Sequence, residues 1–389
     1  MIHINSETKK PLKKTIIVSA VNLVEGGPLT VLQECLGYLS GNLSEEYEII
    51  ALVNKKELAS FKNIRYFEFP KAKKSWLMRL YYEYIYFRRF SKEIKPHLWL
   101  SLHDITPNVR AKILAVYCHN PAIFYKLNLK EILIEPKLWL FNLFYKYLYM
   151  INIKRNNWVI VQQSWIRENF KKLFKIENII VAHPDVKQTV IDKRNRCAPE
   201  QNGKFIFFYP ALARVFKNFE IIGEAARILT DQGLNNFEIY LTINGTENKY
   251  SNLIYNKYKG IPSIKFIGIQ PKEAILDYYS TVNCLIFPSK LETWGLPINE
   301  FKDFSKPMLL ADLEYAKETI GDYDKVKFFD PNNPKQLSDI MKDTIQNKTV
   351  FDKTKAKIIP NAFASNWNSL FKMLLIENDT EVKQVITSS

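Results

Sequence analysis

The sequence lacks the motifs of several common enzyme classes. It contains no G-x-x-x-x-G-K-S/T loop, no H-E-x-x-H pair and no G-x-S-x-G elbow, so P-loop hydrolysis, zinc proteolysis and serine-esterase chemistry have no support. The chain has only four cysteines, which are far apart and form no C-x-x-C pair. That spacing argues against a zinc site and against a disulfide framework.

Long apolar runs and targeting segments are also missing. The start of the chain, Met1 to Lys14, is polar and lysine-rich and does not resemble a secretory signal. The most apolar stretch, Leu138 to Ile153, contains Asn142 and Lys146 and falls short of the roughly 18 uninterrupted apolar residues that cross a bilayer. We therefore expect no transmembrane helix and a cytoplasmic location.

The composition is that of a folded protein with a basic surface. Apolar residues make up 47% of the 389 residues and charged residues 24%, and this length predicts two domains. Lysine and arginine outnumber aspartate and glutamate by 55 to 40, a net charge of +15. The charge favours an anionic partner, which could be nucleic acid, a membrane surface or a phosphorylated small molecule.

Short β-branched and aromatic runs alternate with helical patterns in both halves of the chain. The predicted strands are Lys14–Ala20, Tyr47–Val53, Leu98–Leu102, Ile113–Cys118, Trp158–Gln162, Lys204–Tyr209, Phe237–Ile243, Ile264–Ile267, Cys284–Phe287 and Pro307–Ala311. This alternation predicts an α/β protein with two parallel sheets, each covered by helices on both faces. A polar stretch at 186–204 has the chemistry of a linker. We place one domain at 1–190 and a second at 191–360. Residues 361–389 are expected to form a terminal helix, starting at Phe363, and a tail, which pack back toward the first domain.

The segment from Phe287 to Glu300 carries the most specific pattern. A helix is expected to begin near Leu296 or Pro297, and its free amides and positive dipole end attract an anion. Glu292 before the turn and Glu300 within the helix can then face one ligand. The alternative is a helix with two solvent-facing glutamates.

Two cations are expected at the same edge of the sheet. The loop after the strand ending at Tyr209 carries Arg214 and Lys217, and the loops at the carboxyl ends of parallel strands lie together and bind ligands. Both cations could reach a phosphate held above the Glu300 helix, or they could simply be solvated.

With these residues in place, the C-terminal half resembles glycosyltransferase family 4, whose mark is a glutamate pair written E-x7-E. Glu292 and Glu300 have that spacing, and the similarity extends from Phe207 to about Asp330. The resemblance implies the GT-B fold, two Rossmann-like domains facing across a cleft, with the acceptor bound by 1–190 and a UDP- or GDP-linked sugar donor by 191–360. It also implies transfer with retention of configuration and no required cofactor or metal.

By this resemblance Glu292 contacts the transferred sugar, Glu300 the ribose, and Lys217 with a nearby arginine the diphosphate. The family usually has an arginine where this chain has Leu212, so only Arg214 is available for that role. The predicted catalytic residues are Glu292, Lys217 and His119. The predicted donor-binding residues are Arg214, Lys217, Glu292, Trp294, Gly295, Leu296, Glu300, Gly26 and Gly27.

The N-terminal candidates have structural alternatives. Gly26 and Gly27 follow the first strand and could bring backbone close to a ligand, or they could form a simple turn. His119 ends an apolar strand and could face the cleft or serve the core. The nearby pair His103 and Asp104 could act on an acceptor hydroxyl.

Two further segments carry a hypothesis each. Asp322 and Asp324 spell the D-x-D of metal-dependent transferases, but they lie in a polar stretch that predicts a surface turn. Residues 71–95 combine eight cations with aromatics. On a helical projection, Leu77 and Tyr81 share the side that packs on the domain, while Arg79 and Arg89 lie on another side suited to an anionic membrane. A solvated basic helix is the alternative.

The sequence and the resemblance thus predict a retaining glycosyltransferase that moves a sugar to a glycan or lipid-linked acceptor in surface polysaccharide synthesis. Residues 71–95 offer a contact with an anionic membrane surface as a further partner. A sugar-nucleotide epimerase and a non-catalytic, membrane-associated assembly subunit are the alternatives. No RNA-module motif accompanies the cations, so we expect no nucleic-acid partner.

Overall fold

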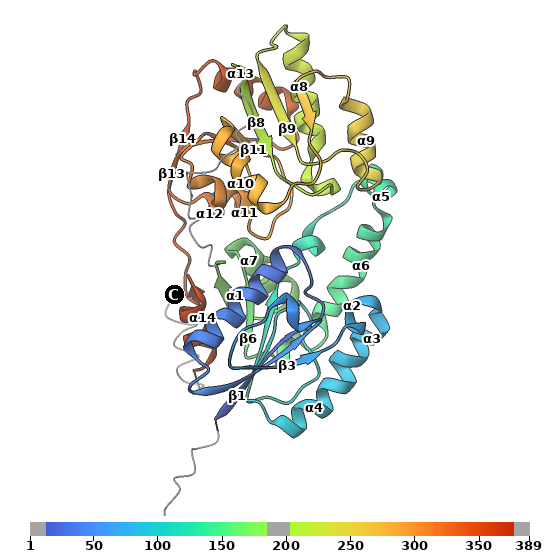
Figure 1. The fold of residues 1–389 in the computed structure, drawn as a ribbon, viewed down its shortest axis with the longest axis vertical. Helices are drawn as coiled ribbons and strands as arrows, with labels where there is room; N and C mark the ends of the chain where they lie inside the picture. Colours follow the sequence, from blue (N-terminus) through green and yellow to red (C-terminus); the bar gives the residue numbers. More distant parts are fainter. Residues whose placement is uncertain (1–12, 185–202, 377–389) are drawn as a thin grey trace, which may run out of the picture.

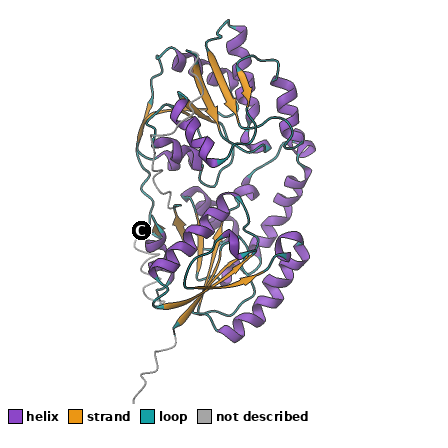
Figure 2. Cartoon of the chain, in the orientation of Figure 1, coloured by secondary structure: helices purple, strands orange, loops and turns teal. Residues whose placement is uncertain are grey.

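The structure, a computed structural model, describes residues 13–184 and 203–376. Figures 1 and 2 show two α/β domains, one above the other, with strands at the centre of each and helices around them. The domain boundary predicted near residue 190 lies outside the described residues. Cys35, Cys118 and Cys284 are buried and free, and Cys197 is outside the described part of the chain.

The N-terminal domain contains an eight-stranded sheet with the order β15-β7-β6-β5-β4-β1-β2-β3, in which all neighbours are parallel. Its strands are β1 (Lys14–Ala20), β2 (Tyr47–Val53), β3 (Ile64–Glu68), β4 (Leu98–Ser101), β5 (Ile113–Cys118), β6 (Trp158–Val161), β7 (Ile179–Ala182) and β15 (Phe363–Ala364). The central strands are buried on both faces, which explains their continuous apolar runs.

The C-terminal domain contains a seven-stranded sheet with the order β10-β9-β8-β11-β12-β13-β14. Its strands are β8 (Phe205–Tyr209), β9 (Phe237–Leu241), β10 (Ile264–Phe266), β11 (Cys284–Phe287), β12 (Met308–Ala311), β13 (Tyr323–Phe329) and β14 (Asp352–Thr354). Only β14 among these runs antiparallel to its neighbour. The strands predicted in both halves are confirmed, within one or two residues at their ends.

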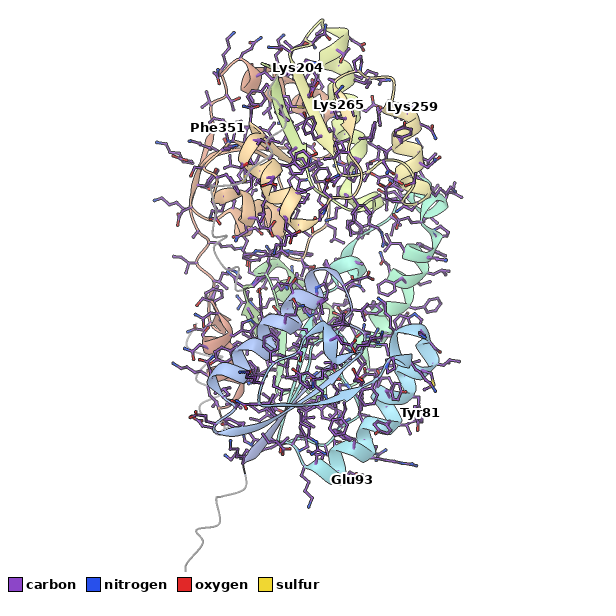
Figure 3. All side chains as sticks on the ribbon, viewed as in Figure 1. Tyr81, Glu93, Lys204, Lys259, Lys265 and Phe351 are labelled. Atoms are coloured by element: carbon purple, nitrogen blue, oxygen red, sulfur yellow. The ribbon has the colours of Figure 1, made fainter. Side chains whose placement is uncertain are left out.

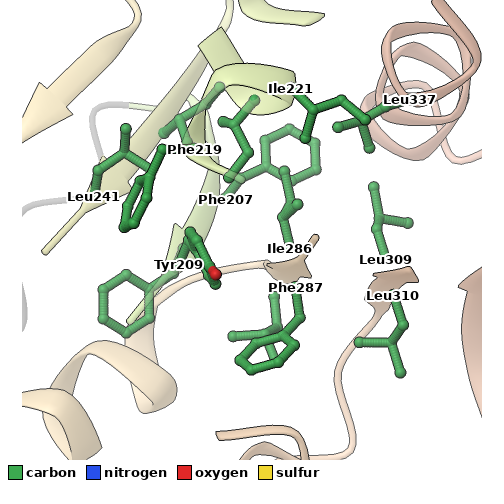
Figure 4. Close-up of a cluster of buried hydrophobic side chains, with 14 of the residues drawn as sticks. Phe207, Tyr209, Phe219, Ile221, Leu241, Ile286, Phe287, Leu309, Leu310 and Leu337 are labelled. Atoms are coloured by element: carbon green, nitrogen blue, oxygen red, sulfur yellow. The ribbon is translucent and has the colours of Figure 1, made fainter. Parts of the chain in front are cut away.

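Helices connect the strands and cover both sheets. Outside the segment 71–95 they are α1 (Gly26–Asn42), α5 (Leu129–Ile134), α6 (Pro136–Met150), α7 (Ser164–Phe174), α8 (Phe219–Asp231), α9 (Lys249–Tyr258), α10 (Lys272–Thr281), α11 (Leu296–Lys302), α12 (Glu314–Ile320), α13 (Pro334–Ile345) and α14 (Trp367–Leu374). In the C-terminal core, Figure 4 shows Phe207 beside Ile221 and Ile286 between the sheet and its helices. Each fully buried side chain of this size contributes about 1.5–3 kcal/mol.

In each sheet the order of the strands reverses once, so that successive strands are added first on one side and then on the other. In the N-terminal sheet the change lies between β1 and β4, and in the C-terminal sheet it lies between β8 and β11. Ligands of open α/β sheets bind beyond the carboxyl ends of the strands at such a point, because the connecting helices leave on opposite faces and open a crevice. The topology therefore marks the loops after β8 and β11, and the loop after β1, as the place for a site.

The chain returns to the N-terminal domain at its end. Phe363 and Ala364 form β15, which pairs with Val181 and Ala182 at the edge of the first sheet. The prediction of a helix starting at Phe363 is therefore wrong at its first residues, because a free sheet edge takes up this extended backbone. The helix α14 follows, and its Phe371 ring stacks on Tyr38 of α1 at 5.5 Å.

The segment 71–95 is helical, but not as one regular helix. It consists of α2 (Lys71–Lys74), α3 (Trp76–Tyr81), a π-helical turn at Tyr82–Tyr86 and α4 (Phe87–Ile94). The predicted faces are wrong for Leu77, which is 80% exposed, and for Arg79, which is 5% exposed, whereas Arg89 is exposed as predicted. Glu83 is fully buried. Leu77 and Arg79 precede the π turn, so the change of helical repeat does not explain their sides. Arg79 turns inward because it donates to a buried carbonyl group of the domain.

Arg79 and Glu83 are buried because they meet a histidine of the neighbouring strand end. His103 Nε2 lies 3.3 Å from the Glu83 carboxylate and 3.1 Å from Ser19 Oγ, and Arg79 Nη2 donates to the His103 carbonyl at 2.9 Å. Burial raises the pKa of Glu83 to about 8, against a smaller lowering by Arg79. Burial, followed by the charge of Arg79, holds the pKa of His103 well below its ordinary value.

This cluster predicts a pH-dependent stability. Because the pKa of Glu83 is raised in the folded state, its protonated form stabilises the fold at low pH, and that contribution is lost as the pH rises to about 8. We expect Glu83→Gln, which needs no proton, to gain stability relative to the wild type between pH 5.5 and 8 by at most ~1.4 kcal/mol per pH unit. Urea unfolding across this range measures the difference. The control Glu93→Gln, exposed on α4, should show no such trend, and a constant difference for Glu83→Gln would contradict the assignment.

Candidate active site

A cavity of about 520 Å³ lies between the two domains. The N-terminal domain contributes the start of α1, the end of β5 and the end of β6, and the C-terminal domain contributes the loops after β8 and β11 and the start of α11. The predicted site residues that line this cavity are Gly27, His119, Lys217, Glu292, Trp294, Gly295, Leu296 and Glu300. The cavity lies where both changes of strand order predict a crevice.

The loops after β8 and β11 are tied together by hydrogen bonds. The backbone N–H of Lys290 donates to the carbonyl of Phe216 at 2.7 Å, and the side-chain amide of Asn218 donates to the carbonyl of Pro288 at 3.3 Å. Since β8 and β11 are adjacent parallel strands, both loops leave the sheet at the same edge. This fixes Lys217 next to the residues that follow β11.

Lys217 and Glu292 form an ion pair at the edge of the cavity. Their side chains are 17% and 13% exposed, and the ammonium also lies 5.7 Å from the ring of Phe216 and 5.8 Å from that of Phe287. The ammonium thus lies near two aromatic rings, and the pair is partly shielded from water. A partly desolvated cation with one carboxylate partner is well placed to bind a polyanion that competes for it.

Glu300 and a second lysine line the same cavity. Tyr279 donates its hydroxyl proton to Glu300 Oε2 at 3.2 Å, and burial raises the pKa of the Glu300 carboxyl, with Lys272 opposing it. Lys272, the first residue of α10, also lines the cavity. Sequence reasoning missed it because no motif surrounds it, although its place after the strand β10 puts it at the same edge.

The turn before α11 has the expected geometry. Gly295 has φ +89, a left-handed conformation that favours glycine, and α11 begins at Leu296 as predicted. The ring of Trp294 lies 4.4 Å from that of His183 in the N-terminal domain. Trp294 therefore contacts both domains at the wall of the cavity.

Arg214 lies apart from the cavity lining. Its guanidinium pairs with Glu135 at 3.0 Å, and its side chain is 45% exposed. Leu212, at the position where an arginine was expected, does line the cavity. A role for Arg214 at the diphosphate stays a prediction, and it requires release from Glu135.

The N-terminal glycines lie at the start of α1. Gly26 has φ +67 and is not among the lining residues, whereas Gly27 lines the cavity. A Cβ atom on Gly27 would lie 3.9 Å from Leu296 Cδ1. The start of α1 therefore faces the start of α11 across the cavity.

His119 lines the cavity from the end of β5. Its ring stacks on Tyr117 at 4.5 Å, and burial lowers its pKa, so the imidazole is neutral at pH 7. Thr293 donates its hydroxyl proton to the His119 carbonyl at 2.7 Å, which joins the two domains. The Nε2 atom is buried without a hydrogen-bond partner in the described structure.

His103 and Asp104 are not among the residues that line the cavity. Asp104 Oδ1 accepts the backbone N–H of His119 at 2.6 Å and that of Asn120 at 3.1 Å. Its carboxylate also accepts hydroxyl protons from Tyr145 at 2.8 Å and Tyr149 at 2.9 Å. Asp104 therefore anchors the loop that carries His119 instead of facing an acceptor.

The D-x-D segment lies at the other end of the sheet. Asp322 and Asp324 are exposed and flank Tyr323, the first residue of β13. In a parallel sheet the amino end of a strand is opposite the edge where Lys217 and Glu292 lie. The two carboxylates are therefore placed away from the cavity.

A second cavity of about 290 Å³ adjoins the first. The two share six lining residues, among them Lys272, Pro297 and Glu300, and the second extends to Thr242 and Gln270 in the loops after β9 and β10. The site is thus elongated, with Glu300 at the junction and the Lys217–Glu292 pair in the larger part.

Comparison with known proteins gives a family match in the C-terminal domain. Residues 190–364 match the family model described as "Glycosyl transferases group 1", which covers the domain that holds Lys217, Glu292 and Glu300. No curated protein sequence matches the chain.

Solved structures match over nearly the whole chain. The lipopolysaccharide outer core galactosyltransferase WaaB is 14% identical, with 96% of this chain and 95% of that chain covered and a TM-score of 0.58. A glycosyltransferase from Rickettsia africae is 16% identical, with 97% and 100% covered and a TM-score of 0.59. HepE from Anabaena, in complex with UDP-glucose, is 14% identical, with 96% and 98% covered and a TM-score of 0.58.

The fold is therefore GT-B, two Rossmann-like domains facing across a cleft, as predicted. With the family match in the C-terminal domain, the class of this enzyme is glycosyltransferase.

A buried carboxylate fixes the two domains beside the cavity. Glu318 of α12 accepts the backbone N–H of Ser164, the first residue of α7, at 2.9 and 3.1 Å, and lies 3.2 Å from His183 Nε2. Its neighbour Thr319 donates to the carbonyl of Trp294. Burial alone would raise the pKa of Glu318, but the hydrogen bonds from His183 and Ser164 outweigh it and the pKa is lowered.

We expect Glu318→Gln to destabilise the protein by about 2 kcal/mol at pH 7, the usual effect of losing hydrogen bonds to a charge. Because the folded pKa is lowered, the wild-type advantage is present above the unfolded pKa and shrinks as the pH falls through the folded pKa. Thermal unfolding of both proteins from pH 7 to 4 measures it. The control Glu314→Gln, exposed on the same helix, should change stability little. Equal effects of both variants would contradict the role of Glu318 in holding the two domains together.

Proposed function

We propose that this protein is a retaining glycosyltransferase that transfers a sugar from a nucleoside-diphosphate sugar, with UDP ahead of GDP as the nucleotide. The acceptor is a glycan or a lipid-linked glycan of surface polysaccharide synthesis. The observation that carries the proposal is the Lys217–Glu292 pair in the interdomain cavity, with Glu300 in the same cavity. HepE, a neighbour of the same fold, is described in complex with UDP-glucose, which supports a uridine nucleotide here.

The elongated site suggests how the donor lies. The diphosphate would take Lys217 from Glu292, since two adjacent phosphates with two negative charges in total outcompete a single carboxylate for an ammonium. Glu292, once released, could accept hydrogen bonds from hydroxyls of the sugar. Glu300 would accept from the ribose, and the smaller cavity beyond it would hold the base.

Charge stabilisation is the main catalytic contribution in this proposal. As the glycosidic bond breaks, negative charge develops on the departing diphosphate, and Lys217 would stabilise it. Lys272 adds a second positive charge along the cavity. The neutral His119 and the start of α1 face this region from the N-terminal domain, where the acceptor would enter.

We expect three substitutions to separate the parts of the donor. Lys217→Gln should weaken UDP and UDP-sugar binding about 10- to 100-fold, the effect of losing a hydrogen bond to a charge. Glu292→Gln should weaken the UDP-sugar relative to UDP, because only the sugar loses a partner while the diphosphate no longer competes with a carboxylate for Lys217. Glu300→Gln should weaken both, because each contains the ribose. Thermal shift measures all three, since ligand at 100 times its dissociation constant adds about 2.7 kcal/mol.

Lys265→Gln is the matched control, because Lys265 is an exposed lysine of the same domain that pairs with Glu238 on the surface. It should bind UDP like the wild type. A UDP response that survives Lys217→Gln unchanged would contradict the proposed diphosphate site. Release of an isomerised sugar nucleotide without any acceptor would instead identify an epimerase.

A further inference from the structure

The helix α6 carries large apolar side chains on its solvent-facing side as well as on its buried side. Leu138, Tyr145 and Tyr149 point into the domain and are buried. Its exposed apolar residues are Trp139, Leu140, Leu143, Phe144, Tyr147 and Met150, followed by Ile151. They recur at the helical spacing, so they form one continuous outer stripe. A surface helix normally turns polar residues to solvent, so an apolar outer stripe is normally covered.

The stripe continues onto neighbouring elements. Leu129 and Leu133 of α5 are 81% and 72% exposed. On α3 and the π turn, Trp76, Leu77, Tyr81, Ile85 and Tyr86 are exposed too. The ring of Trp76 meets that of Tyr145 of α6 edge-on at 6.5 Å, and Figure 1 shows α3 and α6 along the same side of the N-terminal domain.

Most of the large apolar side chains that are exposed in the described part of the chain lie on these elements. Fourteen of the nineteen large apolar side chains that are exposed among residues 13–184 and 203–376 lie in 76–86 and 129–151. We call these fourteen residues the apolar face. Large contiguous patches of this kind mark interaction sites, because scattered exposure is the normal pattern of a soluble surface.

Cations frame the apolar face, and carboxylates are nearly missing from it. In 71–95 and 126–146, both wholly described, the exposed lysines and arginines are Lys71, Lys73, Lys74, Arg88, Arg89, Lys92, Lys95, Lys126, Lys130, Lys137 and Lys146. The one exposed carboxylate in these segments is Glu93. Figure 3 shows Tyr81 projecting from α3 and Glu93 at the far end of α4.

We propose that the apolar face docks on an anionic lipid bilayer, with α6, α3 and the π turn lying in the headgroup region. Apolar side chains would enter the lipid while the surrounding cations bind anionic headgroups. Tryptophan and tyrosine, which make up five of the fourteen residues, are the residues that favour the membrane–water interface.

The composition favours a bilayer over a protein partner. Lysine is depleted at protein–protein interfaces, whereas seven exposed lysines flank this face on α2 to α6 alone, counting only Lys71, Lys73, Lys74, Lys92, Lys130, Lys137 and Lys146. Within the described residues, no helix has the length and apolar character to cross a membrane. The face therefore suits attachment along the surface. It extends the proposed function by naming where a lipid-linked acceptor would be met, but it does not depend on donor chemistry.

Vesicle flotation of the full chain without any donor tests the docking. We expect binding to vesicles of phosphatidylcholine mixed equally with phosphatidylglycerol, weak binding to phosphatidylcholine alone, and release at high salt. Leu143→Gln with Phe144→Gln should lower the partition coefficient on the order of tenfold per side chain. Arg88→Gln with Arg89→Gln should lower it on the order of fivefold per charge.

Leu253→Gln is the matched control, because Leu253 lies on α9 of the other domain and is 45% exposed, against 48% for Leu143. It should bind vesicles like the wild type. All variants should keep the wild-type unfolding temperature and UDP response, which separates loss of docking from loss of fold or donor site.

Equal flotation of the wild type and Leu143→Gln/Phe144→Gln, or no flotation of either, would overturn the proposal. A wild-type dimer in light scattering that these substitutions dissociate would overturn it as well, because a second copy would then cover the face. Flotation lost only in the apolar and basic variants would support it.

Discussion

The contact between Lys217 and Glu292 depends on the parallel pairing of β8 with β11. The two residues are 75 positions apart in the sequence. The loops that carry them nevertheless leave the same edge of the sheet and are joined by the hydrogen bond between Lys290 and Phe216. A cation and a carboxylate so placed neutralise each other when the cavity is empty and become separate ligand contacts when an anion enters. The donor site we propose, its elongation past Glu300 and its position in the cleft all follow from this pairing.

The N-terminal wall of the cavity is set by a second polar framework. Asp104 holds the His119 loop through two backbone N–H groups, and it is itself held by hydroxyls of Tyr145 and Tyr149. Both tyrosines come from α6, whose outer side forms the apolar face. One helix thus connects the surface that we propose to meet lipid with the loop that faces the donor site, so a change at the surface has a short path of buried hydrogen bonds to the cleft.

Local sequence patterns predicted ten of the fifteen strands of the described residues and part of the site. The apolar runs predicted ten strands correctly, since a strand buried on both faces needs an unbroken apolar run wherever it lies in the sheet. The start of α11 was predicted from Pro297, because proline is favoured in the first turn of a helix. The spacing of Glu292, before that turn, and Glu300, within the helix, predicted that both can face one ligand, and the structure brings them with Lys217 to one cavity.

Tertiary structure decided what the sequence pattern left open. Arg79 and Glu83 are buried because His103, on a separate strand end, meets them, and Arg214 pairs with Glu135 of the other domain. Lys272 joins the site only through the order of strands in the sheet. The sequence alone determines which residues are apolar and how they repeat, because these are local properties. Which charge meets which depends on contacts between segments far apart in the chain, and no local pattern encodes those distances.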